Sequence, residues 1–137
     1  MEIWELVARE RIRDTLAHYN WSGDSGRLDD MAESFCEDGH LEIRGQEPLP
    51  GRAAIVSFLS GVTAQEIRIV RHSLANIRIL ELAPQRAHVA SYFTVLTDVG
   101  IDHYGRYRDT FVPVGDKWLI AHRLVSTDWA APDSRMA

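Results

Sequence analysis

The architecture of this 137-residue chain follows from the stretch IRIVRHSLANIRILEL, residues 67–82. From Glu66 onward the hydrophobic period is two, and β-branched and aromatic residues dominate, a pattern typical of strands. The segment Val114-Gly115-Asp116 is predicted to join the last two strands in a tight hairpin. We predict four long strands: Ile67 to Leu82, Arg86 to Thr97, Asp102 to Pro113, and Lys117 to Thr127.

Three helices are predicted upstream of these strands, because apolar residues recur there at the spacing of one helix face. The stripe of the first contains Ile12, Leu16 and Tyr19, extended earlier by Ile3 and Leu6, with Gly23 ending the helix. The apolar stripe of the second helix spans residues 28–35, and the third helix begins at Pro50-Gly51. Asp38-Gly39 should turn the chain into a short strand, His40 to Arg44. This order predicts an α+β fold, with the helices segregated from a mostly antiparallel sheet.

Apolar residues occupy both predicted faces of the first long strand. One face would hold Ser73, Ala75, Ile77 and Ile79, and the other Val70, His72, Leu74, Leu80 and Leu82. A sheet that is apolar on both sides must be covered twice. The helices would cover one face, and a second copy of the chain would cover the other, so we expect a homodimer or homotrimer.

Composition narrows the class of protein. The length indicates one domain, residues 1–137, with a core over about 3–129 and a frayed tail over 130–137. The net charge is −5 with scattered positive residues, which argues against nucleic-acid binding. The charged amino-terminal pattern is typical of an amphipathic helix and not of a membrane span, so a cytoplasmic protein is expected. Cys36 is the only cysteine, and the histidines show no metal-binding spacing, so no disulfide, metal or cofactor is predicted.

Four residues could form a reactive site: Tyr19, Asp24, His72 and Arg123. A carboxylate that accepts from one imidazole nitrogen leaves the other nitrogen free as a general base. A phenol or guanidinium could then stabilise an oxyanion or a departing group. Each residue also has a purely structural interpretation. Asp24, or its neighbour Ser25, could cap the second helix, and His72 and Tyr19 could be core residues.

Arg123 lies on an apolar face and requires a carboxylate or a ligand oxygen. A structural pair with Asp109 is the alternative to a role in substrate binding. Asn76 is predicted to share the face of His72, where it could bind substrate or bridge strands. Asp98 or Asp109 would supply the acid–base group of a cyclase, and Tyr107 and Trp21 are further candidates for contact with substrate.

Six segments together resemble the nuclear-transport-factor-2-like superfamily, specifically its SnoaL-like branch. They are Tyr19-Asn-Trp-Ser-Gly-Asp24, Phe35-Cys-Glu-Asp-Gly39, Gly51-Arg-Ala-Ala-Ile55, His72-Ser-Leu-Ala-Asn76, Gly105-Arg-Tyr-Arg-Asp109 and Trp118-Leu-Ile-Ala-His-Arg123. The resemblance implies three helices in the concavity of a strongly curved sheet, a cone-shaped α+β barrel around a deep apolar pocket. Scytalone dehydratase, bile-acid dehydratase and hexachlorocyclohexane dehydrochlorinase-type proteins share this fold, as do cyclases, isomerases and binding modules.

In the resembling dehydratases, an aspartate at the position of Asp24 orients a histidine at the position of His72. Tyr19 resembles their tyrosine, whereas the dehydrohalogenase has a lysine there. The steroid isomerases carry their base where this chain has Ile43, so that chemistry would require Glu42 as a substitute. We therefore predict a cofactor-independent, dehydratase-like lyase acting on a small, mostly apolar cyclic, polyketide-like or steroid-like molecule. The alternatives are a cyclase or isomerase using the same pocket, and a non-catalytic ligand-binding or assembly module.

Overall fold

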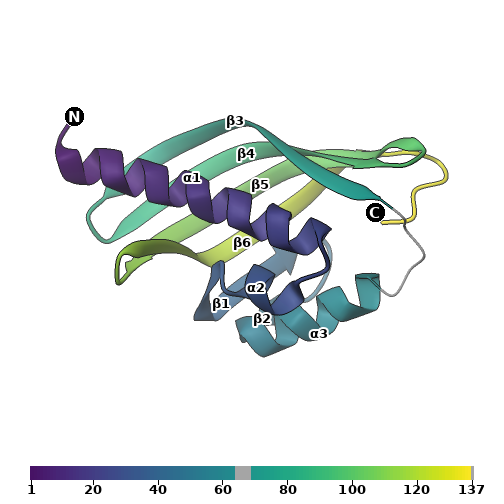
Figure 1. Ribbon diagram of the computed structural model, residues 1–137, viewed down its shortest axis with the longest axis horizontal. Coiled ribbons are helices and arrows are strands. Elements are labelled where there is room, and N and C mark those ends of the chain that lie inside the picture. The colour runs from purple at the N-terminus through teal and green to yellow at the C-terminus, as the bar shows by residue number, and fades with distance from the viewer. Residues whose placement is uncertain (64–68, 137) are drawn as a thin grey trace.

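The computed structural model describes residues 1–63 and 69–136, apart from the side chain of Thr63. The predicted start of the first long strand at Ile67, and the last residue Ala137, lie outside the described residues. Three helices pack against one six-stranded mixed sheet, which confirms the predicted α+β class. In Figure 1, α1 crosses the sheet, while α2 and α3 lie beside the end of the sheet that carries β1 and β2.

The helices are α1 (Ile3–Asp24), α2 (Leu28–Ala32) and α3 (Gly51–Thr63). Glu2 and Glu5 form a capping box at the start of α1 and satisfy two backbone donors there. Ile12, Leu16 and Tyr19 are buried as predicted, but Ile3 and Leu6 are exposed. The reason is visible in Figure 1, where the first turn of α1 extends beyond the hairpin between β3 and β4.

The sheet has the order β2-β1-β6-β5-β4-β3. Its last four members are the predicted long strands and pair antiparallel with their neighbours in sequence. β1 pairs with β6 in parallel, with Leu41 opposite Arg123. The bounds are β1 (Phe35–Ile43), β2 (Leu49–Pro50), β3 (Val70–Ala83), β4 (Arg86–Thr97), β5 (Gly100–Val114) and β6 (Lys117–Ala130).

β1 is longer than the predicted strand. Asp38 and Gly39, expected to form a turn, lie inside β1, where the register against β6 shifts between Phe35 and His40. α2 is correspondingly short and ends before Phe35, whose fully buried side chain belongs to β1. A single segment thus changes from helix to strand within a few residues, and the bulge absorbs the change of direction.

The core fills the space between the sheet and the helices. α1 packs on β3 and β6, and α3 packs on β1. Its fully buried apolar side chains come from both layers: Ile12, Leu16, Phe35, Ile55, Val95, Phe111 and Ile120. Helices and strands therefore share one hydrophobic core, as expected for a single layered domain.

The predicted faces of β3 are wrong from Ile77 to Leu80, whereas Leu82 packs against the core as predicted. Asn76 has a positive φ of 51°, and the pairing with β4 shifts there and again between Ile79 and Glu81. These bulges change the phase of the strand, so Ile77 and Ile79 face the core together with His72, whereas Leu80 is exposed. β3 thus directs most of its apolar residues to the core side, and its outer face needs less cover than the sequence indicated. The homodimer or homotrimer stays a prediction.

The carboxyl-terminal segment differs from the expected frayed tail. Ala130 ends β6, and the next residues fold back onto Asp102 in β5. The backbone N–H of Ala131 donates to the Asp102 carbonyl (2.8 Å), and Ser134 Oγ and the N–H of Arg135 donate to its carboxylate (2.7 and 3.1 Å). A buried carboxylate with several acceptor sites thereby fixes a segment that composition alone indicates to be loose.

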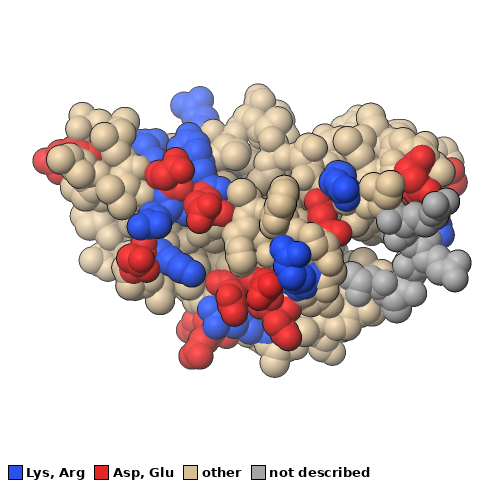
Figure 2. Space-filling view, viewed as in Figure 1, with Lys and Arg blue, Asp and Glu red and all other residues tan. Residues whose placement is uncertain are grey.

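Charge on the surface is mixed. Figure 2 shows acidic and basic side chains interspersed over the face that carries α1 and α2, without a continuous basic area on that face. The same view shows a hollow beside the carboxyl-terminal end of α1. No helix among the described residues is long and apolar enough to cross a membrane.

Candidate active site

The hollow leads to a cavity of about 460 Å³ between the sheet and the helices. Its walls come from the end of α1, from α3, and from the inward faces of the long strands. Most of the lining is apolar, including Met31, Leu41, Phe58 and Phe93. Its polar lining includes Tyr19, Asp24, His72, His103 and Tyr107. A largely apolar cavity of this size with few polar groups is typical of a small-molecule site.

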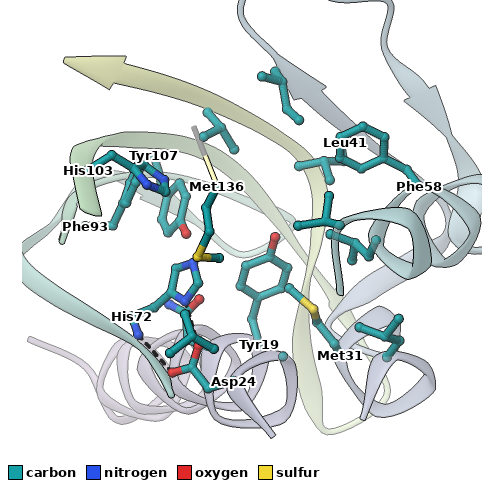
Figure 3. A pocket seen from close by; sticks show the side chains of 18 of the residues that line it. Tyr19, Asp24, Met31, Leu41, Phe58, His72, Phe93, His103, Tyr107 and Met136 are labelled. Carbon is teal, nitrogen blue, oxygen red and sulfur yellow. Dashed lines mark hydrogen bonds and ion pairs between the residues drawn. The ribbon is translucent and has the colours of Figure 1, made fainter. Parts of the chain in front are cut away.

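Asp24 and His72 are in direct contact, as predicted. Nδ1 of His72 lies 2.6 Å from Oδ1 of Asp24, and the backbone N–H of His72 donates to Oδ2 at 2.8 Å. The side chain of His72 is 20% exposed and that of Asp24 is 12% exposed, so water competes little for this pair. Because the carboxylate holds both the ring and its own backbone segment, the imidazole orientation is fixed and Nε2 is the nitrogen left for the cavity (Figure 3).

The capping interpretation of Asp24 is wrong. Asp24 is the last residue of α1, and α2 begins after Arg27, which makes no side-chain cap. Ser25 does not cap α2 either, because its hydroxyl donates to the carbonyl of Trp21 (2.9 Å). The carboxylate of Asp24 therefore serves His72 and not a helix terminus.

Tyr19 lies on the inward face of α1 and is only 5% exposed. Its hydroxyl points into the cavity in Figure 3. Burial raises the pKa of Tyr19, and the nearby Arg123 cation offsets only part of that effect. The phenol is therefore neutral at physiological pH, a hydrogen-bond donor and not a phenolate.

Arg123 is fully buried behind the cavity wall and pairs with Asp109 directly opposite it on β5. Nε and Nη2 of Arg123 donate to the two carboxylate oxygens at 2.8 and 2.9 Å. Its guanidinium carbon also lies 4.3 and 3.8 Å from the ring centroids of Tyr19 and Tyr107. Burial acts to lower the pKa of Arg123, but the charge and hydrogen bonds of Asp109 outweigh it, so the pKa is raised.

Arg123 does not line the cavity, so the geometry favours the structural pair over direct contact with substrate. Both carboxylate oxygens of Asp109 accept hydrogen bonds from Arg123, so Asp109 is not available as an acid–base group. Tyr107 is brought to the cavity, as predicted. Burial raises its pKa, so its hydroxyl is also neutral.

Three predicted contact residues lie elsewhere. Asn76 sits in the bulge of β3 with its side chain exposed, on the face opposite His72. Asp98 is exposed in the turn between β4 and β5, and Trp21 is 74% exposed on the outer side of α1. None of them lines the cavity. Glu42, the substitute base for an isomerase, points to His122 (2.8 Å) and not to the cavity.

His103 and its neighbour Asp102 were not anticipated from the sequence. Nδ1 of His103 lies 2.7 Å from Oδ2 of Asp102, and His103 lines the cavity. Adjacent residues of a strand normally face opposite sides, so an Asp-His pair within a strand gives no signal. Here a register shift leaves Asp102 without a partner on β4, and both residues are buried. Among the residues that the structure describes, no group of three or more His, Cys, Asp or Glu side chains could hold a metal ion.

Comparison with solved structures supports the fold. A protein from Novosphingobium aromaticivorans provisionally named a scytalone dehydratase is 24% identical, with a TM-score of 0.83 over 93% of this chain and 88% of its own. A protein from Catenulispora acidiphila, solved in complex with S-DNPA, is 25% identical (TM-score 0.79; 88% and 92% covered). ActVI-ORFA from Streptomyces coelicolor is 21% identical (TM-score 0.79; 88% and 96% covered).

No curated protein matches the chain. The model of the SnoaL-like domain matches residues 4–124, nearly the whole chain. This match confirms the resemblance stated from the sequence. The chain belongs to the SnoaL-like domain family, within the nuclear-transport-factor-2-like superfamily.

Proposed function

We propose that this protein is a dehydratase-like lyase that eliminates water from a small, mostly apolar cyclic molecule. The observation that carries the proposal is the Asp24–His72 contact at the edge of an open apolar cavity. A structural histidine would be packed on all sides, whereas this ring has one nitrogen held by a carboxylate and lines a cavity. A binding or assembly module has no need of such a pair.

His72 would act as the base. With Nδ1–H donating to Asp24, the neutral ring carries its lone pair on Nε2 and can accept a proton from carbon. The Asp24 carboxylate would then stabilise the imidazolium that forms. Its two contacts to His72, through the ring and the backbone, hold the base in one orientation during the reaction.

Tyr19 would stabilise the developing oxyanion. Its neutral hydroxyl can donate to a carbonyl oxygen whose negative charge grows as the neighbouring C–H bond breaks. The Arg123 cation over its ring face makes the phenol a stronger donor without entering the cavity. Arg123 is therefore proposed as a positioning residue, which differs from the direct role expected from the sequence.

The substrate class follows from the lining. An apolar body would fill the space among Met31, Leu41, Phe58 and Phe93, with a carbonyl directed to Tyr19 and the acidic C–H to His72. The S-DNPA complex of the Catenulispora acidiphila protein supports the use of this fold for small molecules. A cyclase or isomerase is less well supported, because Asp98 and Glu42 lie away from the cavity and Asp109 is paired.

The test separates proton removal from elimination. Tetralone, a bicyclic ketone, would be incubated with the protein in D2O, and exchange of its α-protons followed by NMR. A panel of cyclic β-hydroxyketones would be screened in parallel for formation of the conjugated enone. We expect wild-type protein to accelerate both, and His72→Gln to lose about 100-fold or more. Equal rates for wild type, His72→Gln and the exposed control His40→Gln would contradict the proposal.

A further inference from the structure

His103 and His72 occupy one row of the sheet. His72 on β3 pairs with Val95 on β4, and Val95 pairs with His103 on β5. Residues paired directly across strands point to the same face, and both histidines line the cavity. With neighbouring strands about 4.8 Å apart, the two α-carbons are separated by about 10 Å.

The two imidazoles are held in the same way. In each, Nδ1 contacts a carboxylate, Asp24 for His72 and Asp102 for His103, at 2.6 and 2.7 Å. Within residues 1–63 and 69–136, Nε2 of neither ring has a hydrogen-bond partner. The cavity therefore has a carboxylate-oriented imidazole at each of two points, although their environments differ.

The difference lies in the carboxylates. Asp102 accepts from Ser134 Oγ and from the backbone N–H of Arg135 as well as from His103. Burial would raise its pKa, but these hydrogen bonds outweigh burial and the pKa of Asp102 is lowered. The His103 and Asp102 side chains are only 10% and 5% exposed. The Asp102 carboxylate is thus held by three donors and is buried more deeply than Asp24, whose side chain is 12% exposed.

We propose that His103, positioned by Asp102, is the second proton-transfer group of the cavity and donates to the leaving oxygen of the substrate. This inference rests on the proposed elimination. His72 Nε2 takes the α-proton, and the C–H electron pair forms the carbon–carbon double bond. The bond from the β-carbon to the hydroxyl breaks with its electron pair on oxygen, and Nε2–H of His103 protonates that oxygen, releasing water. His72 ends protonated and His103 neutral, and exchange with solvent restores both.

The spacing of the row fits this assignment. In the elimination, Nε2 of His72 would lie about 3 Å from the α-carbon and Nε2 of His103 about 2.8 Å from the leaving oxygen. The α-carbon and that oxygen are joined through the β-carbon by two bonds of about 1.5 Å each. The path along these contacts and bonds is about 8 to 9 Å, so the straight line between the two nitrogens is shorter, within reach of two inward-facing side chains on strands two apart. Met136, whose sulfur-containing side chain is labelled in Figure 3, lines the same cavity as the two histidines.

The first test needs no turnover of a substrate. Diethyl pyrocarbonate modifies neutral, accessible imidazole nitrogens, and peptide mass spectrometry locates the modified residues. We expect His103 and His72 to be modified in the native protein, and excess tetralone to slow both, while the exposed His40 reacts equally with and without tetralone. Modification of His103 only after unfolding in urea would overturn the proposal. Modification that excess tetralone does not slow would overturn it as well.

The second test separates the two histidines by reaction step. His103→Gln should retain α-proton exchange of tetralone within about threefold but lose about 100-fold in elimination, whereas His72→Gln should lose both. Asp102→Asn should likewise lose elimination while retaining α-proton exchange, a split between the two steps that a purely structural role would not produce. Unimpaired elimination by His103→Gln would overturn the assignment. If wild type neither exchanges nor eliminates, the proposed function fails, and the labelling experiment alone decides whether His103 faces the ligand.

Discussion

Removing the charge of Asp109 should destabilise the protein strongly, because its partner Arg123 cannot reach water. Both side chains are 0% exposed, and two charge-assisted hydrogen bonds join them. Each such bond contributes about 1.5–3 kcal/mol, and breaking a buried ion pair by removing one partner costs about 3–5 kcal/mol. We therefore expect Asp109→Asn to lower the free energy of unfolding by about 3–5 kcal/mol, measured by urea denaturation followed by circular dichroism.

An exposed ion pair on the same two strands provides the control. Arg106 and Asp128 are in contact at 3.0 Å, but their side chains are 45% and 38% exposed. Asp128→Asn should change the free energy of unfolding by less than about 1 kcal/mol. Replacing both buried partners, as Asp109→Leu with Arg123→Met, should recover most of the loss, because no unpaired charge remains. If Asp109→Asn costs no more than Asp128→Asn, the reasoning from burial is refuted.

Three further predictions test other features. Asp102→Asn should lower the free energy of unfolding at neutral pH. Because the pKa of Asp102 is lowered in the folded state, the difference in stability between wild type and variant is fully present above the unfolded pKa of about 3.9 and is lost as the pH falls further. Urea denaturation at pH 7 and at about pH 3 measures it. Gly105→Ala should cost about 1–3 kcal/mol or more in thermal unfolding, because a Cβ there collides with the Ser126 carbonyl oxygen, whereas Gly61→Ala, with open space around it, should not. Tyr19→Phe should slow α-proton exchange of tetralone about 100-fold with less than about 1 kcal/mol lost in stability; an unchanged exchange rate would remove Tyr19 from the mechanism.

The sheet and the main helix were predictable because local pattern and burial agree along most of the chain. The four long strands alternate with period two between clear turns, and the buried face of α1 repeats at Ile12, Leu16 and Tyr19. The contact between Asp24 and His72 could also be anticipated, since the resemblance brings together two residues that are distant in sequence. In these regions each level of the structure points to the same answer.

Two of the failures, the faces of β3 and the unanticipated pair of Asp102 and His103, have the same physical cause, which is a change of strand phase. A positive φ at Asn76 turns Ile77 and Ile79 inward, and asparagine is one of the few residues that adopt this conformation readily. A second irregularity, at Asp102, places an aspartate and the following histidine in the interior together. Alternation assumes a regular pleat, so an inserted residue reverses the assignments that follow it until a second irregularity restores the phase, as it does before Leu82. Trp21, a candidate for contact with substrate, was misplaced for another reason: it lies on the outer side of α1 and is 74% exposed.

The parallel pairing of β1 with β6 has a consequence for how the chain reaches its native state. β3 to β6 are joined by successive hairpins and can associate through contacts close in sequence, but β1 gains its main partner only when the last strand is present. The chain between β1 and β6 must be closed into a long loop, at a cost in entropy, before the contacts between these strands can stabilise it, and this slows folding. During synthesis, residues 35–43 therefore keep one strand edge unpaired until residues 120–125 have left the ribosome. β6 is the strand that joins the two halves of the sheet, and a nascent chain without it cannot complete its core.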